Sequence, residues 1–343
     1  MQMKAVQFIG TQRSGSNLLR VMLNEHSKIS SPHPPHILQV MMPFLPIYGS
    51  LANDNNFKIL VEDVCHLVET NPVNWGLNFD RNQIATNCSN RNLVQIMKAI
   101  YEAKANLKGA SVWCCKSMAS IHYIKEIEDS GIEPFYIFIF RDGRDVACSF
   151  RKAVVGEKHL YQLAQQWKTE QDLSIALCER VGPSRSISVR YENLIVDAEK
   201  ELKRICEALK IEFEPSMLNY ASAEESKVTA SSGQMWGNLV KPVMKDNTKK
   251  YLKELTSAEI EIFESVAGST LEALGYERET PANFRLEFSA RDIDSFKNEN
   301  AALQAEAKAG AIEDMQKRKK QDEFIATLKR RFHDFNATQN VNA

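Results

Sequence analysis

Residues 8–20 read Phe-Ile-Gly-Thr-Gln-Arg-Ser-Gly-Ser-Asn-Leu-Leu-Arg, a predicted strand that runs through a glycine-spaced loop into a helix. Gly10 and Gly15 have the spacing of a Walker A loop, but Ser16 and Asn17 stand where that loop has its lysine and its magnesium-binding hydroxyl. The backbone amides at the start of the helix can still bind an anion, because unpaired N–H groups and the helix dipole favour negative charge. The stretch therefore predicts a site for a phosphate-like group that needs no metal.

Strands and helices alternate outward from this loop. Apolar runs suited to buried parallel strands occupy residues 5–9, 112–115, 135–140 and, more weakly, 187–189. Apolar stripes at helical spacing cover residues 93–101, 202–209 and 260–274. Asp197 is a candidate N-cap for the second of these helices, and Gly275 follows the third as its C′ residue. The alternation predicts a P-loop-like, three-layer α/β fold around a central parallel sheet, with ligands at the carboxyl ends of the strands.

The composition changes after about residue 280. Residues 291–332 are rich in Ala, Glu, Lys, Gln and Arg, and we expect one long, mostly polar helix there. Too few apolar residues recur at heptad spacing for a strong coiled coil, so the helix packs either on a partner, as in a homodimer, or back on the domain. We therefore expect a domain over residues 1–280, with a helical cap around 43–91, and a polar helical tail over 281–343.

Bulk properties exclude several classes of protein. The 43 basic residues nearly balance the 44 acidic ones, which argues against general binding to nucleic acid or to a membrane surface. The chain has seven cysteines and no Cys-x-x-Cys pair, which favours a reducing compartment over a disulfide framework. The first predicted strand starts by about Lys4, which leaves no room for a signal peptide, and no apolar run approaches the ~20 residues that span a bilayer. We expect a soluble, cytoplasmic protein.

A second anion-binding signal follows the strand predicted at 135–140. It reads Arg141-Asp-Gly-Arg-Asp-Val-Ala-Cys-Ser149, with the arginine at the strand end and the serine about two turns into a helix. One guanidinium fork and one hydroxyl could hold the same phosphate. A Walker B strand would end in a metal-holding aspartate, whereas this strand ends in Arg141. The pattern points away from magnesium-dependent chemistry.

The two loops, in this order and at strand ends, resemble those of sulfotransferases that use 3′-phosphoadenosine 5′-phosphosulfate (PAPS). The similarity extends through Val189-Arg-Tyr-Glu-Asn-Leu194 and Val240-Lys-Pro-Val243, so it covers roughly residues 4–275. The arginine at position 13 and the Arg-Asp-Gly-Arg run look more like the protein-tyrosine, carbohydrate and bacterial branches. The cytosolic small-phenol enzymes usually have a lysine at the position of Arg13.

The resemblance implies two sets of residues that bind PAPS, without a metal. The 5′-phosphosulfate would be held by the first loop, through Arg13, Ser14, Gly15, Ser16 and Asn17. The 3′-phosphate and the rest of the nucleotide would be contacted by Arg141, Ser149, Tyr191 and Lys241. In a lid before Lys241, Trp236 would cover either the adenine or the acceptor, unless it is simply a buried structural residue.

Sulfuryl transfer also needs charge neutralisation at the leaving phosphate oxygen. Arg13 and Lys116 are candidates, since Lys116 follows a predicted strand at the same cleft and matches a lysine with this role in the tyrosine branch. Fixed cations aimed at a leaving oxygen act by electrostatic preorganisation.

The proton acceptor is less defined by the sequence. The small-phenol enzymes have a histidine where this chain has Met118, and the tyrosine branch uses a glutamate where this chain has His33 and His36. A histidine suits removal of a hydroxyl proton at neutral pH. We prefer His33, because flanking prolines fix its backbone. His122 and His159 are further candidates.

These observations predict a sulfotransferase that moves a sulfuryl group from PAPS to an acceptor hydroxyl by in-line displacement. Two alternatives stay open: a P-loop kinase or nucleotidase, which requires ATP and Mg²⁺, and a non-catalytic nucleotide-binding scaffold that acts through its tail. The acceptor is a small molecule, a carbohydrate or a peptide tyrosine. Phe44, Tyr48 and Trp75 either stack on that acceptor or pack the cap.

Overall fold

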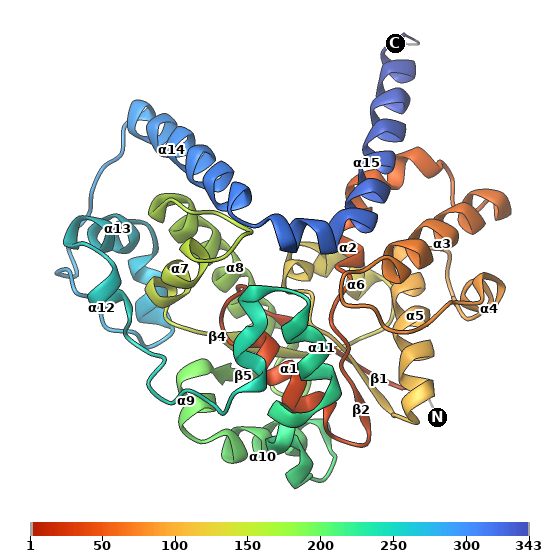
Figure 1. Ribbon diagram of the computed structural model, residues 1–343, viewed down its shortest axis with the longest axis horizontal. Coiled ribbons are helices and arrows are strands. Elements are labelled where there is room, and N and C mark those ends of the chain that lie inside the picture. The colour runs from red at the N-terminus through yellow and green to blue at the C-terminus, as the bar shows by residue number, and fades with distance from the viewer. Residues whose placement is uncertain (1–2, 342–343) are drawn as a thin grey trace.

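The computed structural model describes residues 3–341 and has a central sheet of five parallel strands in the order β2-β3-β1-β4-β5 (Figure 1). The strands are β1 Lys4–Ile9, β2 Ile29–Ser30, β3 Val112–Cys115, β4 Phe135–Phe140 and β5 Ser186–Arg190. The expected α/β fold with a parallel sheet is confirmed, as are four strands. The two-residue β2 was not expected, because so short a strand leaves no apolar run.

Strand β1 lies at the centre of the sheet, where Val6 pairs with Cys114 on one side and with Phe135 on the other. Its residues alternate between two faces, and both faces are buried. Burial on both sides explains the continuous apolar runs that predict the strands.

Helices cover both faces of the sheet and complete the three layers. The elements of the amino-terminal part are α1 Ser16–Asn24, α2 Ile37–Met41, η1 Met42–Tyr48, α3 Asp54–Glu69, α4 Arg81–Thr86, α5 Leu93–Lys108, η2 Met118–Tyr123 and α6 Ile124–Asp129. Those of the middle part are α7 Gly143–Arg151, α8 Leu160–Val181, α9 Tyr191–Val196, α10 Ala198–Leu209, η3 Pro215–Ser222, α11 Glu224–Ser231, η4 Gln234–Val240, α12 Tyr251–Glu254 and α13 Ser257–Ala273. Helices α1 and α10 pack on one face, while α5, α8 and α13 pack on the other.

Two predicted helix ends are confirmed in detail. Asp197 caps α10, since its carboxylate accepts a hydrogen bond from the Lys200 amide at 3.0 Å. Gly275 follows α13 with φ +73°, and the Tyr276 amide donates to the Leu271 carbonyl at 2.9 Å. This is the Schellman arrangement, which favours glycine at that position.

The segment 43–91, expected as a helical cap, contains most of η1 and all of α3 and α4. Its aromatic side chains Phe44, Tyr48 and Trp75 are buried against other parts of the protein. Phe44 contacts Phe332 of the tail with ring centroids 5.8 Å apart, and the Tyr48 hydroxyl donates to Asp63 at 2.6 Å. Trp75 donates its indole N–H to the His33 carbonyl at 2.7 Å. This bond connects the segment to the loop that carries His33.

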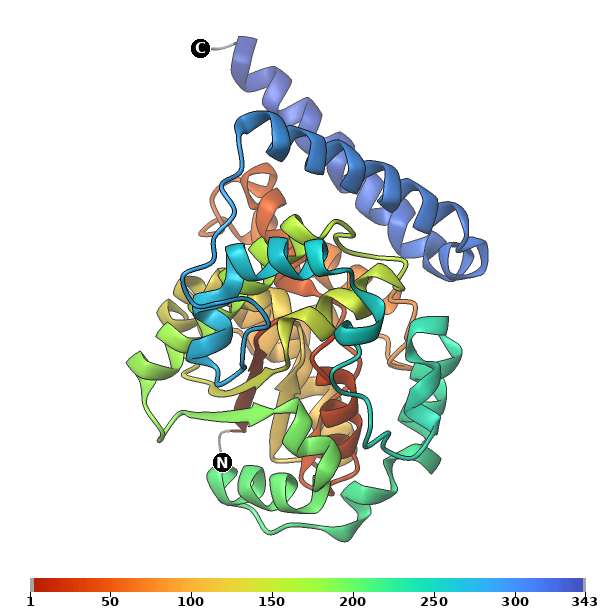
Figure 2. The same ribbon diagram turned by 90° about the vertical axis from the view of Figure 1, so that its left-hand side faces the viewer.

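The tail forms two helices, α14 Ala290–Ala309 and α15 Ile312–Val341, instead of the single one expected. The break falls at Gly310, the residue with the greatest backbone freedom in the tail. Both helices lie across the side of the molecule opposite the amino-terminus (Figures 1 and 2). Leu328 of α15 is fully buried against the amino-terminal part, so the tail packs back on the domain. A homodimer through the tail stays a prediction.

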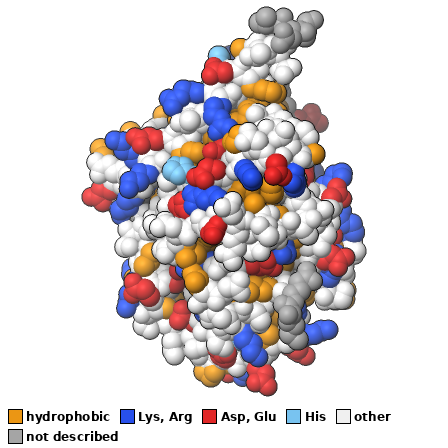
Figure 3. Space-filling model, turned by 90° about the vertical axis from the view of Figure 1, so that its right-hand side faces the viewer, with side chains coloured by type: hydrophobic (Ala, Val, Ile, Leu, Met, Phe, Trp, Pro, Cys, Tyr) orange, Lys and Arg blue, Asp and Glu red, His pale blue; other side chains and the backbone are white. Residues whose placement is uncertain are grey.

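The surface shows no separation of charge on the face drawn in Figure 3, where basic and acidic side chains are interspersed. This fits the near-balance of charges in the sequence. In the described residues 3–341, no helix combines the length and the apolar character that a bilayer crossing requires.

Candidate active site

A cavity of about 1080 Å³ opens at the carboxyl ends of the strands. Both anion-binding loops reach it, together with the segment after β3, the start of α9 and the η4 region. The predicted topology thus brings together residues from distant parts of the chain. The segment 43–91 supplies none of the described residues that line it.

The first loop has the backbone of a tight anion cradle. Arg13 and Gly15 both have positive φ, +70° and +84°, and Gly15 directly precedes α1. A Cβ on Gly15 would lie 2.2 Å from the Tyr191 ring, so only glycine fits between the loop and that ring. Ser14 and Asn17 each bury a side-chain oxygen that has no hydrogen-bond partner within residues 3–341 as described. Unpaired buried polar atoms beside a helix amino-terminus fit a phosphate-bearing ligand.

Arg13 and Ser149 connect the two loops. The Arg13 Nε donates to the Ser149 hydroxyl at 3.0 Å. Burial and the neighbouring charge of Arg141 lower the pKa of Arg13. Neighbouring guanidinium groups repel each other, and an anion between them would relieve the repulsion.

Arg141 lies against Tyr191, with its guanidinium carbon 4.6 Å from the centre of the ring. Its Nη2 donates to the Asn247 carbonyl at 2.8 Å and to Asp145 at 3.2 Å. Its buried Nε finds no partner in the part of the chain that the structure describes. Asn247 also donates from Nδ2 to the Tyr191 hydroxyl at 2.5 Å. Arg141, Ser149 and Tyr191 therefore lie together at the cavity, as the resemblance implies.

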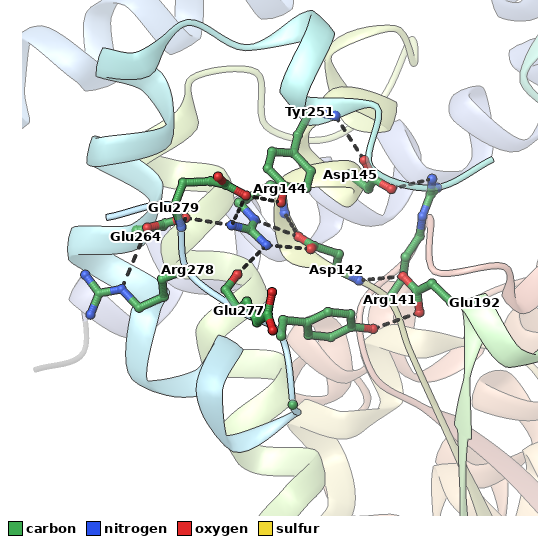
Figure 4. Close-up of polar contacts among 12 residues, drawn as sticks. Arg141, Asp142, Arg144, Asp145, Glu192, Tyr251, Glu264, Glu277, Arg278 and Glu279 are labelled. Carbon is green, nitrogen blue, oxygen red and sulfur yellow. Dashed lines mark hydrogen bonds and ion pairs between the residues drawn. The ribbon is translucent and has the colours of Figure 1, made fainter. Parts of the chain in front are cut away.

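A buried network of charged side chains holds the segment that carries Arg141 (Figure 4). Asp142 caps α7 and accepts two hydrogen bonds from the Arg144 guanidinium, at 3.0 and 2.7 Å. Arg144 also donates to Glu264 of α13 at 2.6 Å. Asp145 holds Arg141 and accepts from the Tyr251 amide at 3.1 Å. The network fixes the backbone that carries Arg141, and it explains the aspartate and the second arginine of the Arg-Asp-Gly-Arg motif.

Lys116 is buried directly after β3 and lines the same cavity. Burial and the charges of Arg20 and Arg13 lower its pKa to about 7. A lysine held among cations in this way gains its full charge when an anion arrives.

His33 and His36 both line the cavity. The His33 ring lies edge-on to Trp236, with centroids 4.8 Å apart. Its buried Nδ1 has no hydrogen-bond partner among the residues that are described. His36 has φ +58°, and its Nδ1 lies 3.1 Å from the Ser117 hydroxyl. Burial and nearby cations, Lys116 above all for His36, lower both pKa values, that of His36 to about 3. Both imidazoles are therefore neutral at pH 7.

Among the predicted site residues, Ser14, His159 and Lys241 are absent from the described residues that line the cavity. Ser14 is buried, and the His159 ring stacks on Phe296 of the tail.

Lys241 directly follows η4. Its side chain is exposed and absent from the lining, although its neighbours Pro242 and Val243 belong to it. Lys250 and Asn247 line the cavity from the same stretch of chain. No spacing in the sequence distinguishes them from the other polar residues there.

Arg318 of α15 was also missed by sequence reasoning. It lines the cavity, with its guanidinium carbon 5.8 Å from the centre of the Trp236 ring. Its neighbour Lys317 donates to the Ser231 carbonyl at 2.7 Å, which ties the tail to α11. Trp236 itself is buried between His33 and this arginine. The tail therefore forms part of the cavity wall.

The chain belongs to the sulfotransferase family, whose model matches residues 6–215. That range includes both anion-binding loops, the histidine segment and Tyr191. A curated relative, protein-tyrosine sulfotransferase A of Caenorhabditis elegans, is 22% identical over 282 residues, which are 80% of this chain and 68% of that protein. Sulfuryl transfer is therefore the activity class of this chain, and the kinase, nucleotidase and scaffold alternatives are not favoured.

Two solved structures share the fold. The sulfotransferase domain of the Synechococcus PCC 7002 olefin synthase superposes with a TM-score of 0.51 and 22% identity, covering 81% of this chain and 95% of that one. The sulfotransferase domain from the curacin biosynthetic pathway superposes with a TM-score of 0.52 and 19% identity, covering 81% of this chain and 100% of that one. The expected P-loop-like sulfotransferase fold is thus confirmed.

Proposed function

We propose that this sulfotransferase takes its sulfuryl group from PAPS and transfers it to an acceptor hydroxyl by in-line displacement, without a metal ion. The observation that carries this proposal is the contact of Arg13 with Ser149, at 3.0 Å, beside Arg141 in one cavity. When bound, PAPS supplies an activated sulfuryl group on a phosphate leaving group.

The first loop and the second loop have different tasks in this proposal. Amides and side chains of Arg13–Asn17 hold the 5′-phosphosulfate at the start of α1. Arg141 and Ser149 hold the 3′-phosphate, and the Tyr191 ring keeps the Arg141 guanidinium in place. The unpaired polar atoms of Ser14, Asn17 and Arg141 provide the hydrogen-bonding capacity that such an anion requires. Lys241 is exposed and absent from the described lining, so its contact with the nucleotide stays a prediction.

Arg13 and Lys116 neutralise the charge that develops on the leaving oxygen. Both are fixed at the cavity before any ligand binds, which is the condition for electrostatic preorganisation. His33 and His36 are neutral and line the same cavity, so each has a lone pair with which to take a proton.

The acceptor is the hydroxyl of a peptide tyrosine, a carbohydrate or a small molecule. The tyrosine sulfotransferase relative supports the first of these.

All seven cysteines are free, which supports a location of the protein in a reducing compartment such as the cytoplasm.

A label-transfer assay tests the proposal. The full chain is incubated with PAPS labelled in its sulfuryl group and with a tyrosine-containing peptide, an oligosaccharide and a simple phenol, in buffer containing a chelator. The proposal expects label on at least one acceptor and stoichiometric 3′-phosphoadenosine 5′-phosphate (PAP). Transfer that requires Mg²⁺, or label retained on PAPS with every acceptor, would contradict it.

A further inference from the structure

A histidine–carboxylate pair lines the cavity apart from His33 and His36. His122 belongs to η2 and Glu170 to α8, and both line the cavity. The His122 Nε2 lies 3.7 Å from the Glu170 Oε1. The imidazole is 43% exposed and the carboxylate 8% exposed, so the histidine is accessible while its partner is buried.

Glu170 is held in place and keeps unused hydrogen-bonding capacity. Its Oε1 accepts a hydrogen bond from the Gln166 side chain at 3.0 Å, one turn back along α8. Its Oε2 is buried and has no partner among the described residues. A buried carboxylate with a free oxygen stabilises a positive charge that forms beside it.

Two connections join this pair to the segments that carry the proposed catalytic cations. Helix η2 starts at Met118, two residues after Lys116, so His122 follows directly from the end of β3. Gln171, next to Glu170, donates to the Thr11 hydroxyl at 2.9 Å in the first loop. The pair is therefore connected through η2 to the segment that carries Lys116, and through Gln171 to the loop that carries Arg13.

The surroundings of the three histidines differ in charge. Burial lowers the pKa of both His33 and His36. Nearby cations lower it further: Arg20, Lys116 and Arg318 for His33, and Lys116 and Arg318 for His36. For His122, Glu170 is the one charged group among the described residues that shifts the pKa, and it raises that pKa. A general base is most effective when its pKa lies near the working pH. The surroundings thus lower the basicity of His33 and His36, whereas Glu170 raises that of His122.

We propose that His122, held by Glu170, takes the proton of the acceptor hydroxyl during sulfuryl transfer. The inference rests on the proposed function. The acceptor oxygen forms a bond to sulfur, the bond from sulfur to the 5′-phosphate oxygen breaks with its electron pair left on that oxygen, and the hydroxyl proton moves to His122. With the Nε2 proton directed at Glu170, the lone pair lies on Nδ1. His122 is then the catalytic residue and Glu170 a positioning residue.

A first test needs no acceptor. Nuclear magnetic resonance of the full chain, with PAP bound, follows the His122 ring signals across pH in the wild type and in Glu170→Gln. The inference expects the His122 pKa to lie above 6.5 in the wild type and to fall in the variant. An unchanged His122 pKa would overturn the role of Glu170.

A second test measures turnover with labelled PAPS and the acceptor panel described above. His122→Gln should lower kcat about 100-fold or more while the Kd for PAP stays within about twofold. His333→Gln, at an exposed position of the tail, is the matched control. In Glu170→Gln, the rise of kcat with pH should move to lower pH.

A loss of kcat in His33→Gln or His36→Gln, with His122→Gln unaffected, would overturn this inference alone. A wild-type chain that transfers no label would instead overturn the proposed function.

Discussion

The Nε of Arg13 and the hydroxyl of Ser149 are joined by a hydrogen bond of 3.0 Å, although the two residues are 136 positions apart in the chain. The bond fixes the distance between the first loop, which starts α1, and helix α7, which follows the second loop. In the proposed function, the two loops would thus hold the two charged ends of the nucleotide at a set separation.

Ser149→Ala should weaken PAP binding, because it removes a hydroxyl that both positions Arg13 and can reach a phosphate. A hydrogen bond to a charged group contributes about 1.5–3 kcal/mol, so we expect roughly a 10- to 100-fold higher Kd by calorimetry. Ser231→Ala, at an exposed serine of α11, is the control and should bind normally. Equal affinity in both variants would remove Ser149 from the site.

Gly15→Ala should abolish tight PAP binding. The new Cβ would lie 2.2 Å from the Tyr191 ring, so either the loop or the ring must move. Gly109→Ala is a matched control, since Gly109 also has positive φ, +69°, but a methyl group there would have no other atom within 4 Å. The control should lose only about 1 kcal/mol of stability and keep its affinity. Similar PAP affinity in the two variants would contradict the cradle described for the first loop.

Lys116 should take up a proton when PAP binds at pH 8. Its pKa of about 7 means that it is mostly neutral at that pH, and a bound anion raises the pKa and so draws in a proton. At pH 6 the lysine is already charged, so uptake should largely disappear. Titration in buffers of different ionisation enthalpy measures the number of protons. Uptake at pH 8 that persists in Lys116→Met would assign it to another group.

Arg144→Met should destabilise the fold more than it affects the cavity directly. The variant leaves Asp142 and Glu264 buried without their guanidinium partner, and breaking such a pair typically costs about 3–5 kcal/mol. Arg151→Met removes only an exposed ion pair with Glu259 and should cost no more than about 1 kcal/mol. Denaturant unfolding of the two variants compares these costs, and equal values would show that the network in Figure 4 adds little.

The sequence predicts the sheet well because parallel strands buried on both faces are continuous apolar runs. It also predicts the first loop and Arg141, because the carboxyl ends of such strands meet at one edge. The tail is harder to predict. The line of Phe324, Leu328 and Phe332 marks a packing face, but nothing in the sequence shows which part of the domain that face contacts.

Side chains that depend on tertiary contacts are the ones that sequence reasoning missed or misplaced. Arg318 reaches the cavity only because α15 folds back, and Lys241 stays exposed although it matches the family pattern. The pairing of His122 with Glu170 joins η2 to α8, and no local spacing indicates it. The cationic surroundings of His33 likewise come from residues on other segments.

The most direct test of the central claim is calorimetric titration of the full chain with PAP, with ATP and Mg²⁺ as the comparison, on the wild type and on Arg141→Ala. The account predicts tight binding of PAP in a chelating buffer, loss of that binding in Arg141→Ala, and no comparable binding of ATP. Tight binding of ATP with Mg²⁺, or PAP binding that Arg141→Ala leaves intact, would contradict it.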